Sequence, residues 1–155
     1  MIYVTRALPV NVDGQPKLTR QQVWKGLVLK ADNALPFVPA MTECTVTARL
    51  GINVFDRDIV FRGASFSERI TLQEPHRVVF TRTAGPVLGT ILNEIEEENH
   101  ELALRFSFAV VVLDVEPGSL EEKRYADDMT DDYLKAVDAT LAAMRRIAAE
   151  SEATL

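Results

Sequence analysis

The chain has 155 residues, 47% of them hydrophobic, with a formal net charge of -6 and a pI near 5.0. This length suits a single domain over residues 1–155, large enough to fold around a core without a metal ion or a disulfide bond. The acidic charge would repel phosphate backbones, so nucleic acid is not expected as a partner.

Cysteine content and hydropathy bear on where the protein works. Cys44 is the single cysteine, which excludes an internal disulfide, and the start of the chain lacks the basic and apolar blocks of a secretory signal. We therefore expect a reduced, cytoplasmic protein. The longest apolar run, residues 108–113, is far shorter than the roughly 20 residues that cross a bilayer. It indicates a buried strand, and no association with a membrane is expected.

The first part of the chain predicts one strand and one helix. Apolar residues alternate over residues 2–12, which predicts a strand that ends at an Asp-Gly turn. Thr19 and Gln22 have the spacing of a capping box, in which each side chain accepts a hydrogen bond from the other residue's backbone N–H. A helix is therefore expected to begin at Thr19 and to be ended by Asn33 and the segment 35–39, which contains two prolines.

The middle of the chain is expected to form strands only. Apolar and polar residues alternate between turn-forming residues, a pattern typical of half-buried antiparallel strands joined in series. The clearest strand is the last, because its even positions from 102 to 112 are all apolar. The expected strands cover residues 42–50, 55–62, 66–73, 77–83, 87–97 and 102–115.

The C-terminal stretch predicts one long amphipathic helix. Residues 119–150 contain neither glycine nor proline, and their apolar members recur at steps of three and four. Ser119 and Glu122 repeat the capping-box spacing. Such a helix would be roughly 45 Å long and needs a broad surface to cover its apolar face. The order of elements predicts an α+β fold, a curved antiparallel sheet of about six to seven strands wrapped on this helix, with room for a pocket between them.

Short motifs also carry a resemblance. They are QVWKGL at 22–27, KA at 30–31, FVP at 37–39, EPHRV at 74–78 and NEI at 93–95. With them, the chain resembles the acetylaranotin-cluster-L-like family over nearly its whole length. That family resembles the START-like (SRPBCC) helix-grip superfamily, which includes pollen-type plant allergens and polyketide cyclase-like proteins. The resemblance implies one helix-grip domain, while fold analogy alone does not choose between ligand carriers and cyclases. The glycine-rich loop of the plant allergens has no counterpart here.

Candidate functional residues are polar side chains that alternation places on apolar faces. Glu68 shares a face with the apolar residues of its strand, and Arg82 does so in the next strand. A register that pairs residue 72 with 78 also pairs Glu68 with Arg82. Asn93 faces inward as well, because a two-residue turn at Glu98-Asn99 would pair it with Leu104. Arg6 is on the apolar face of the first strand and could join this group.

Two interpretations of Glu68 and Arg82 stay open. They form a structural ion pair or escape at the rim of the sheet, or they line a pocket and orient a ligand or handle a proton. A paired carboxylate is ionised and is a poor acid at neutral pH. Pairing would therefore favour binding over catalysis.

Aromatic and sulfur-containing side chains either fill the core or form the wall of a ligand cavity. Tyr133 is the most informative, because its hydroxyl needs a partner once it is buried. We expect the first half of the long helix to form cavity wall and residues 137–148 to anchor the helix on the core. The predicted ligand-binding residues are Glu68, Arg82, Asn93, Phe66, Phe80, Phe106, Met129 and Tyr133.

Several other chemistries lack support in the sequence. His76 and His100 fall in expected turns without a second ligand at a metal-binding spacing, so no metal site is expected. Cys44 has no histidine near it in sequence and is expected to be a small buried hydrophobe. No nucleophile elbow, dinucleotide fingerprint or phosphate-binding loop occurs, and no cofactor is expected.

Three functions remain at this point. The favoured one is binding of a hydrophobic or aromatic small molecule between the sheet and the C-terminal helix. The alternative is a cyclase- or condensation-type enzyme of secondary or aromatic metabolism, with Glu68 or Tyr133 as acid or base and Arg82 stabilising negative charge. The third is an interaction module with a filled interior. The sequence does not predict an oligomeric state.

Overall fold

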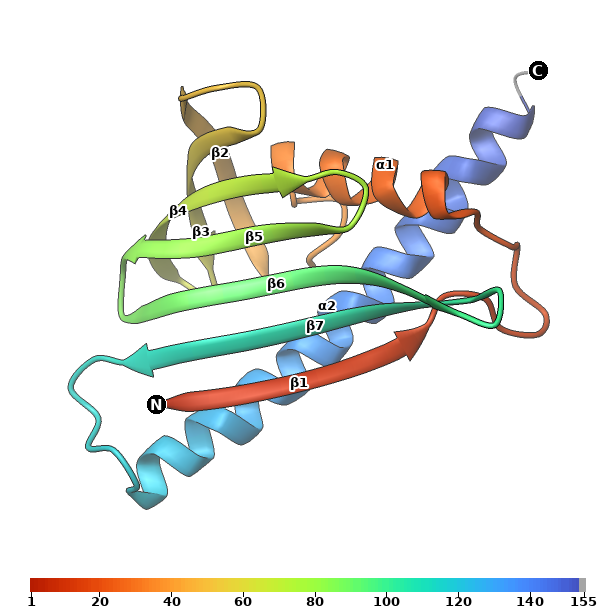
Figure 1. Ribbon diagram of the computed structural model, residues 1–155. Coiled ribbons are helices and arrows are strands. Elements are labelled where there is room, and N and C mark those ends of the chain that lie inside the picture. The colour runs from red at the N-terminus through yellow and green to blue at the C-terminus, as the bar shows by residue number, and fades with distance from the viewer. Residues whose placement is uncertain (154–155) are drawn as a thin grey trace.

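One curved antiparallel sheet of seven strands, packed against two helices, makes up the computed structural model, which describes residues 1–153. Its strands are β1 Ile2–Pro9, β2 Met41–Arg49, β3 Val54–Phe61, β4 Ala64–Gln73, β5 Arg77–Ala84, β6 Val87–Glu98 and β7 Glu101–Val112. The order across the sheet is β1-β7-β6-β5-β4-β3-β2. Consecutive strands from β2 onwards are therefore neighbours, and β1 completes the sheet beside β7 (Figure 1).

Helix α1, Arg20–Asp32, crosses the inner face of the sheet near β5 and β6. Its predicted capping box is confirmed: the Gln22 N–H donates to Thr19 Oγ1 at 3.2 Å, and the Thr19 N–H donates to Gln22 Oε1 at 2.8 Å. Val23, Leu27 and Ala31 are fully buried against the sheet. The spacing of these apolar residues fixes which side of α1 faces inward.

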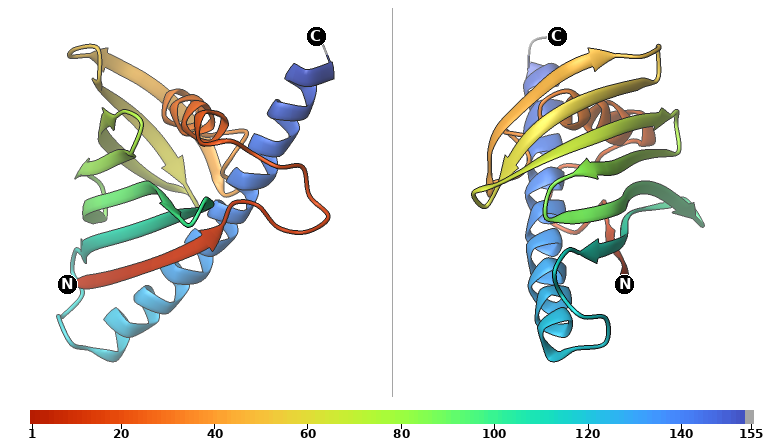
Figure 2. Two further views of the ribbon diagram at one scale, coloured as in Figure 1. Left: turned by 45° about the vertical axis from the view of Figure 1, so that its right-hand side comes forward. Right: turned by 90° about the vertical axis from the view of Figure 1, so that its left-hand side faces the viewer.

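Helix α2, Leu120–Ala153, runs diagonally across the same face of the sheet (Figures 1 and 2). The Glu122 N–H donates to Ser119 Oγ at 3.1 Å, as the second predicted capping box requires. The reciprocal bond differs, because the Glu122 carboxylate accepts from the Gly118 N–H at 3.2 Å. This interaction lowers the pKa of Glu122.

Only the second half of α2 is packed tightly. Among the described side chains of α2, the buried ones start at Ala136 and continue through Leu141 and Met144 to Ala148. At the contact with α1, a Cβ on Gly26 would lie 2.5 Å from the Met144 side chain, so the two helices meet at close range. The prediction that residues 137–148 anchor the helix is confirmed, and the first half is free to bound a cavity.

The predicted boundaries differ from the structure most clearly at three places. β1 ends at Pro9, which has no N–H to donate, and β7 ends at Val112, before Asp114 turns the chain with a φ of 63°. The β6–β7 turn consists of Asn99 and His100, both with positive φ, as in a type I′ turn. The expected turn at Glu98-Asn99 was therefore wrong.

The changed turn also changes the register. Asn93 pairs with Phe106, and the predicted pairing with Leu104 is wrong. Because the shift is by two residues, Asn93 stays on the inner face of the sheet. The predicted pairings of residue 72 with 78 and of Glu68 with Arg82 are both confirmed.

Candidate functional site

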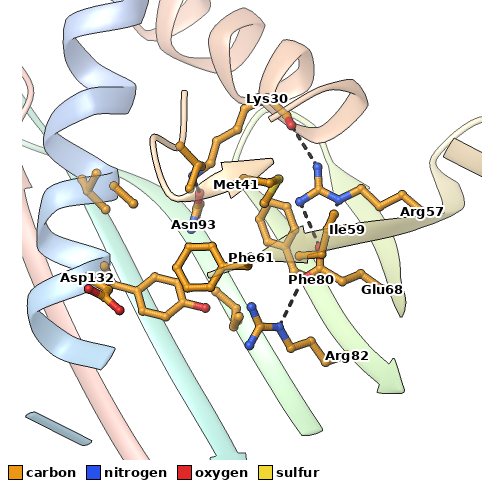
Figure 3. A pocket seen from close by; sticks show the side chains of 15 residues that line it. Lys30, Met41, Arg57, Ile59, Phe61, Glu68, Phe80, Arg82, Asn93 and Asp132 are labelled. Carbon is orange, nitrogen blue, oxygen red and sulfur yellow. Dashed lines mark hydrogen bonds and ion pairs between the residues drawn. The ribbon is translucent and has the colours of Figure 1, made fainter. Parts of the chain in front are cut away.

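Five buried polar side chains meet between α1 and the strands β3 to β6, and we call them the polar cluster (Figure 3). Neighbouring strands pair Arg57 with Glu68 and Glu68 with Arg82, so these three residues form a row across the sheet. Each is less than a tenth exposed. Members of the polar cluster are Lys30, Arg57, Glu68, Arg82 and Asn93.

Arg57 is the member with the most hydrogen bonds. Its Nε donates to Glu68 Oε1 at 3.0 Å, and its Nη1 donates to the backbone oxygens of Lys30 and Ala31 at 3.0 and 2.9 Å. Those oxygens belong to the last turn of α1, where the helix dipole places partial negative charge. Arg57 therefore ties β3 and β4 to the C-terminal end of α1.

Arg82 is held less completely. Its Nε donates to Glu68 Oε2 at 3.5 Å, and its guanidinium lies 4.0 Å from the centre of the Phe66 ring. Within residues 1–153, neither terminal nitrogen of Arg82 has a hydrogen-bond acceptor, and neither is sealed from open space. Although Arg82 is only 7% exposed, its terminal nitrogens therefore keep unused hydrogen-bond donors.

Lys30 closes the other end of the polar cluster. Its Nζ donates to Asn93 Oδ1 at 2.8 Å and lies 5.9 Å from the centre of the Phe80 ring. The pKa of Lys30 is lowered to about 8, mainly by burial and also by the positive charge of Arg57, while the negative charge of Glu68 partly opposes both. The ammonium group therefore releases its proton more readily than an exposed lysine does.

Two adjacent hollows lie beside the polar cluster. The inner one, which we call the chamber, has a volume of about 50 Å³ and is lined by the whole polar cluster. The outer one, which we call the cleft, has a volume of about 630 Å³ and lies under the first half of α2. Residues that line both, and so separate the chamber from the cleft, are Phe61, Arg82, Asp132 and Tyr133.

Tyr133 stands at this boundary, supported from behind by two aromatic rings. Its ring centre lies 6.0 Å from that of Phe106 and 4.9 Å from that of Phe108. Burial raises the pKa of the Tyr133 hydroxyl, while the charge of Arg82 lowers it. No side chain or backbone group within residues 1–153 hydrogen-bonds this hydroxyl. At neutral pH the hydroxyl is protonated and can donate a hydrogen bond, and no protein group among the described residues accepts it.

The predicted site residues occupy different parts of these hollows. Glu68, Asn93 and Phe80 line the chamber, and Phe66 and Met129 line the cleft. Arg82 and Tyr133 line both, as described above. The eighth residue, Phe106, lines neither of the two hollows and is fully buried behind Tyr133.

The expectation that Arg6 joins the group is wrong. Arg6 is exposed on β1, and its Nη1 donates to the Thr5 backbone oxygen at 2.9 Å. β1 is an edge strand, from which a long charged side chain reaches solvent.

With the geometry established, comparison by sequence gives the family. The family described as acetylaranotin biosynthesis cluster protein L matches residues 4–151. The chain belongs to this family. The match confirms the predicted family. No curated protein sequence matches the chain.

Solved structures show what fold this family member shares. A Thermus thermophilus protein is 14% identical with a TM-score of 0.70, over 92% of this chain and 95% of that one. The Zhui aromatase/cyclase of a Streptomyces species is 16% identical with a TM-score of 0.67, over 94% of both chains. A START superfamily protein of Mycobacterium smegmatis is 14% identical with a TM-score of 0.67, over 92% and 98%. These identities establish the START-like helix-grip fold alone.

Sequence reasoning missed three charged residues of the site: Lys30, Arg57 and Asp132. Arg57 alternates with Phe55 and Ile59 on the buried face of β3, so the argument that identified Glu68 would also have found it. Lys30 follows Leu27 by three positions on the buried side of α1. Asp132 gave no such signal, since it is one of several acidic residues on the first half of α2.

Two absences are limited to the described residues. Within residues 1–153 no group of three or more histidine, cysteine, aspartate or glutamate side chains is arranged to hold a metal ion. The helices in the same range include none that is both long and apolar enough to span a membrane.

Proposed function

We propose that this family member binds a hydrophobic or aromatic small molecule in the cleft between the sheet and the first half of α2. The observation that carries the proposal is the cleft itself. Its volume of about 630 Å³ lies within the roughly 300 to 1,000 Å³ typical of small-molecule sites. An interaction module with a filled interior is disfavoured by the same observation.

The composition of the cleft supports an aromatic occupant. Phe61, Phe66, Val87 and Met129 supply apolar wall, and Tyr133 presents a ring together with a hydroxyl. Apolar walls with a few convergent polar groups are the usual composition of such sites, because the walls give affinity and the polar groups give orientation. Here Arg82 and Tyr133 are those polar groups.

Glu68 supports binding rather than catalysis. Its two oxygens face two guanidinium groups, Arg57 at 3.0 Å and Arg82 at 3.5 Å. A carboxylate whose two oxygens both accept from guanidinium groups positions those groups and has no oxygen left to serve a substrate as an acid. We assign Glu68 the role of holding both arginines.

The comparisons support a small molecule as the class of partner. Two of the structures that share the fold are described as aromatase/cyclases, Zhui and the di-domain BexL of the BE-7585A biosynthetic pathway. These descriptions apply to those proteins. For this chain they favour an aromatic molecule over a peptide or a nucleic acid. A cytoplasmic location is part of the proposal, since Cys44 has no second cysteine to pair with.

A cyclase- or condensation-type enzyme is the second candidate. One observation favours it: Lys30, with its pKa lowered to about 8, lies in the chamber that adjoins Tyr133 and Arg82. A lysine poised near neutral pH exchanges protons, and an arginine stabilises negative charge that develops during reaction. If the molecule recovered from the protein changes mass on incubation, the enzyme is supported over the carrier.

The test of binding is native mass spectrometry of protein purified from its own host. We expect a co-purifying small molecule, and we expect Met129→Trp to reduce its occupancy because the larger side chain fills the cleft. Leu29→Trp, an exposed position on α1, is the matched control and should retain the molecule. If nothing co-purifies and a library of aromatic compounds gives no thermal shift, the proposal fails.

A further inference from the structure

The buried charges of the polar cluster do not balance. Lys30, Arg57 and Arg82 bring three positive charges, and Glu68 brings one negative charge; each of these side chains is at most 8% exposed. Arg57 engages Glu68 at the shorter distance and uses its remaining donors on backbone oxygens of α1. The uncompensated positive charge therefore belongs to Lys30 and Arg82.

Of these two, Arg82 faces the space a ligand can occupy. Lys30 lines the chamber, whose volume of about 50 Å³ is too small for an organic molecule, and its Nζ already donates to Asn93. Arg82 lines the cleft of about 630 Å³ and has terminal nitrogens without an acceptor in residues 1–153. An arginine side chain that is only 6% exposed and has unused donors is costly unless an acceptor arrives.

The surroundings of Arg82 specify the acceptor further. The guanidinium lies 4.0 Å from the centre of the Phe66 ring, a favourable cation–π distance, and its two terminal nitrogens keep unused donors. Carboxylate, like phosphate, is a group that a guanidinium binds with two parallel hydrogen bonds, and carboxylate is the smaller and less charged of the two. The Tyr133 hydroxyl, also without a protein partner among the described residues, borders the same space and can donate to the same anion.

We propose that the molecule bound in the cleft is an aromatic carboxylate whose anionic group accepts hydrogen bonds from Arg82 and the Tyr133 hydroxyl. Its rings lie between Phe61 and Phe66 on one side and Met129 of α2 on the other. The inference rests on the proposed function and names the class of ligand. Three aspartates also line the cleft: Asp128 and Asp131 are exposed and screened, and the less exposed Asp132 is paired with Arg62.

The experiment compares two probes of one shape. Naphthoate and naphthamide of the same substitution pattern are titrated into the wild-type protein by calorimetry. We expect naphthoate to bind about tenfold more tightly or better, because only the carboxylate makes charge-assisted hydrogen bonds to the guanidinium. Equal affinity for both probes overturns this inference and leaves the proposed function standing. Failure of both probes to bind counts against both.

Variants of Arg82 test whether this residue causes the preference for naphthoate over naphthamide. Arg82→Gln should bring the affinities for naphthoate and naphthamide to within about twofold, while Lys123→Gln, which removes an exposed charge from α2 outside the cleft, should keep the preference. Arg82→Lys keeps the charge but removes the fork and should give an intermediate preference. Thermal unfolding of each variant checks that it is folded. An Arg82→Gln protein that folds and still prefers naphthoate overturns the assignment.

Discussion

Arg57 and Glu68 face each other across two neighbouring strands, with Arg57 Nε 3.0 Å from Glu68 Oε1 and each side chain only 3% exposed. The pair lies under the last turn of α1, to which Arg57 also donates. The pair therefore joins the sheet to α1. It also holds the Glu68 carboxylate in place, and Arg82 donates to this carboxylate at the edge of the cleft.

Replacing the buried carboxylate should be strongly destabilising. Glu68→Gln keeps the shape of the side chain but leaves Arg57, Arg82 and Lys30 buried without a counter-charge. Breaking a buried pair in this way costs about 3 to 5 kcal/mol in the free energy of unfolding. Urea unfolding measures this loss of stability, provided that the variant retains the circular dichroism spectrum of the wild type.

A matched control exists on the other face of the same two strands. Asp56 pairs with Arg69 at 2.9 Å, but this pair is exposed to solvent. Asp56→Asn should leave the free energy of unfolding nearly unchanged, since exposed pairs contribute little. Equal losses for Glu68→Gln and Asp56→Asn would show that burial of the Arg57–Glu68 pair has no special weight.

Lys30 should make stability depend on pH. Its pKa is about 8 in the folded protein against 10.5 for the free side chain, so the unfolded state binds more protons between these values. Stability contributed by this group therefore rises as pH increases from 8 to 10.5, by about 3 kcal/mol in total. The cost of burying the charge is fully present below pH 8.

The comparison that isolates this contribution is wild type against Lys30→Met. The difference in their free energies of unfolding should change in favour of the wild type over that pH interval, whereas the difference between wild type and Lys25→Met should stay flat. Lys25 is exposed on the same helix and is a suitable control. A difference between wild type and Lys30→Met that does not change with pH would contradict the lowered pKa.

Much of this arrangement could be predicted from the sequence, and the reasons are specific. Thr19 with Gln22 marked the start of α1, and alternation around Glu68 and Arg82 predicted both their pairing and their direction. Local chemistry decides these features, because capping and two-residue periodicity depend on near neighbours only.

The errors come from backbone conformation and from contacts distant in sequence. The β6–β7 turn depends on Asn99 and His100 both taking positive φ, which alternation does not reveal. The partners of Arg57 are on β4 and at the end of α1, elements far apart in the chain. Only the packed fold shows that Glu68 is shared between two arginines and that Arg82 is left with free donors.

Tyr133 should titrate as the most protected of the three tyrosines. Burial raises the pKa of its hydroxyl, while Tyr3 and Tyr125 are exposed. In a near-ultraviolet titration, the difference between wild type and Tyr133→Phe should show one phenol ionising with a midpoint above pH 10.0. Saturation with naphthoate should raise this midpoint further, because an adjacent anion disfavours the phenolate. A midpoint at or below 10.0 would contradict the raised pKa of this half-buried tyrosine.

The mouth of the cleft is bridged by Arg62 and Asp132. Arg62 has a φ of 49° beside Gly63, so the two-residue β3–β4 turn projects its guanidinium onto α2, where Asp132 accepts its hydrogen bond. Asp132 borders both the cleft and the chamber. A ligand in the cleft is therefore partly enclosed by an ion pair whose arginine is 57% exposed.

Removing this bridge should speed release without unfolding the protein. Asp132→Asn should raise the dissociation rate of bound naphthoate by up to about fivefold, because a partly exposed ion pair contributes at most about 1 kcal/mol. Stopped-flow fluorescence measures the rate. Asp127→Asn, an exposed position on α2 outside the cleft lining, is the matched control and should leave it unchanged. If both variants accelerate release equally, general loss of negative charge is the cause, and the Arg62–Asp132 bridge does not restrain the ligand.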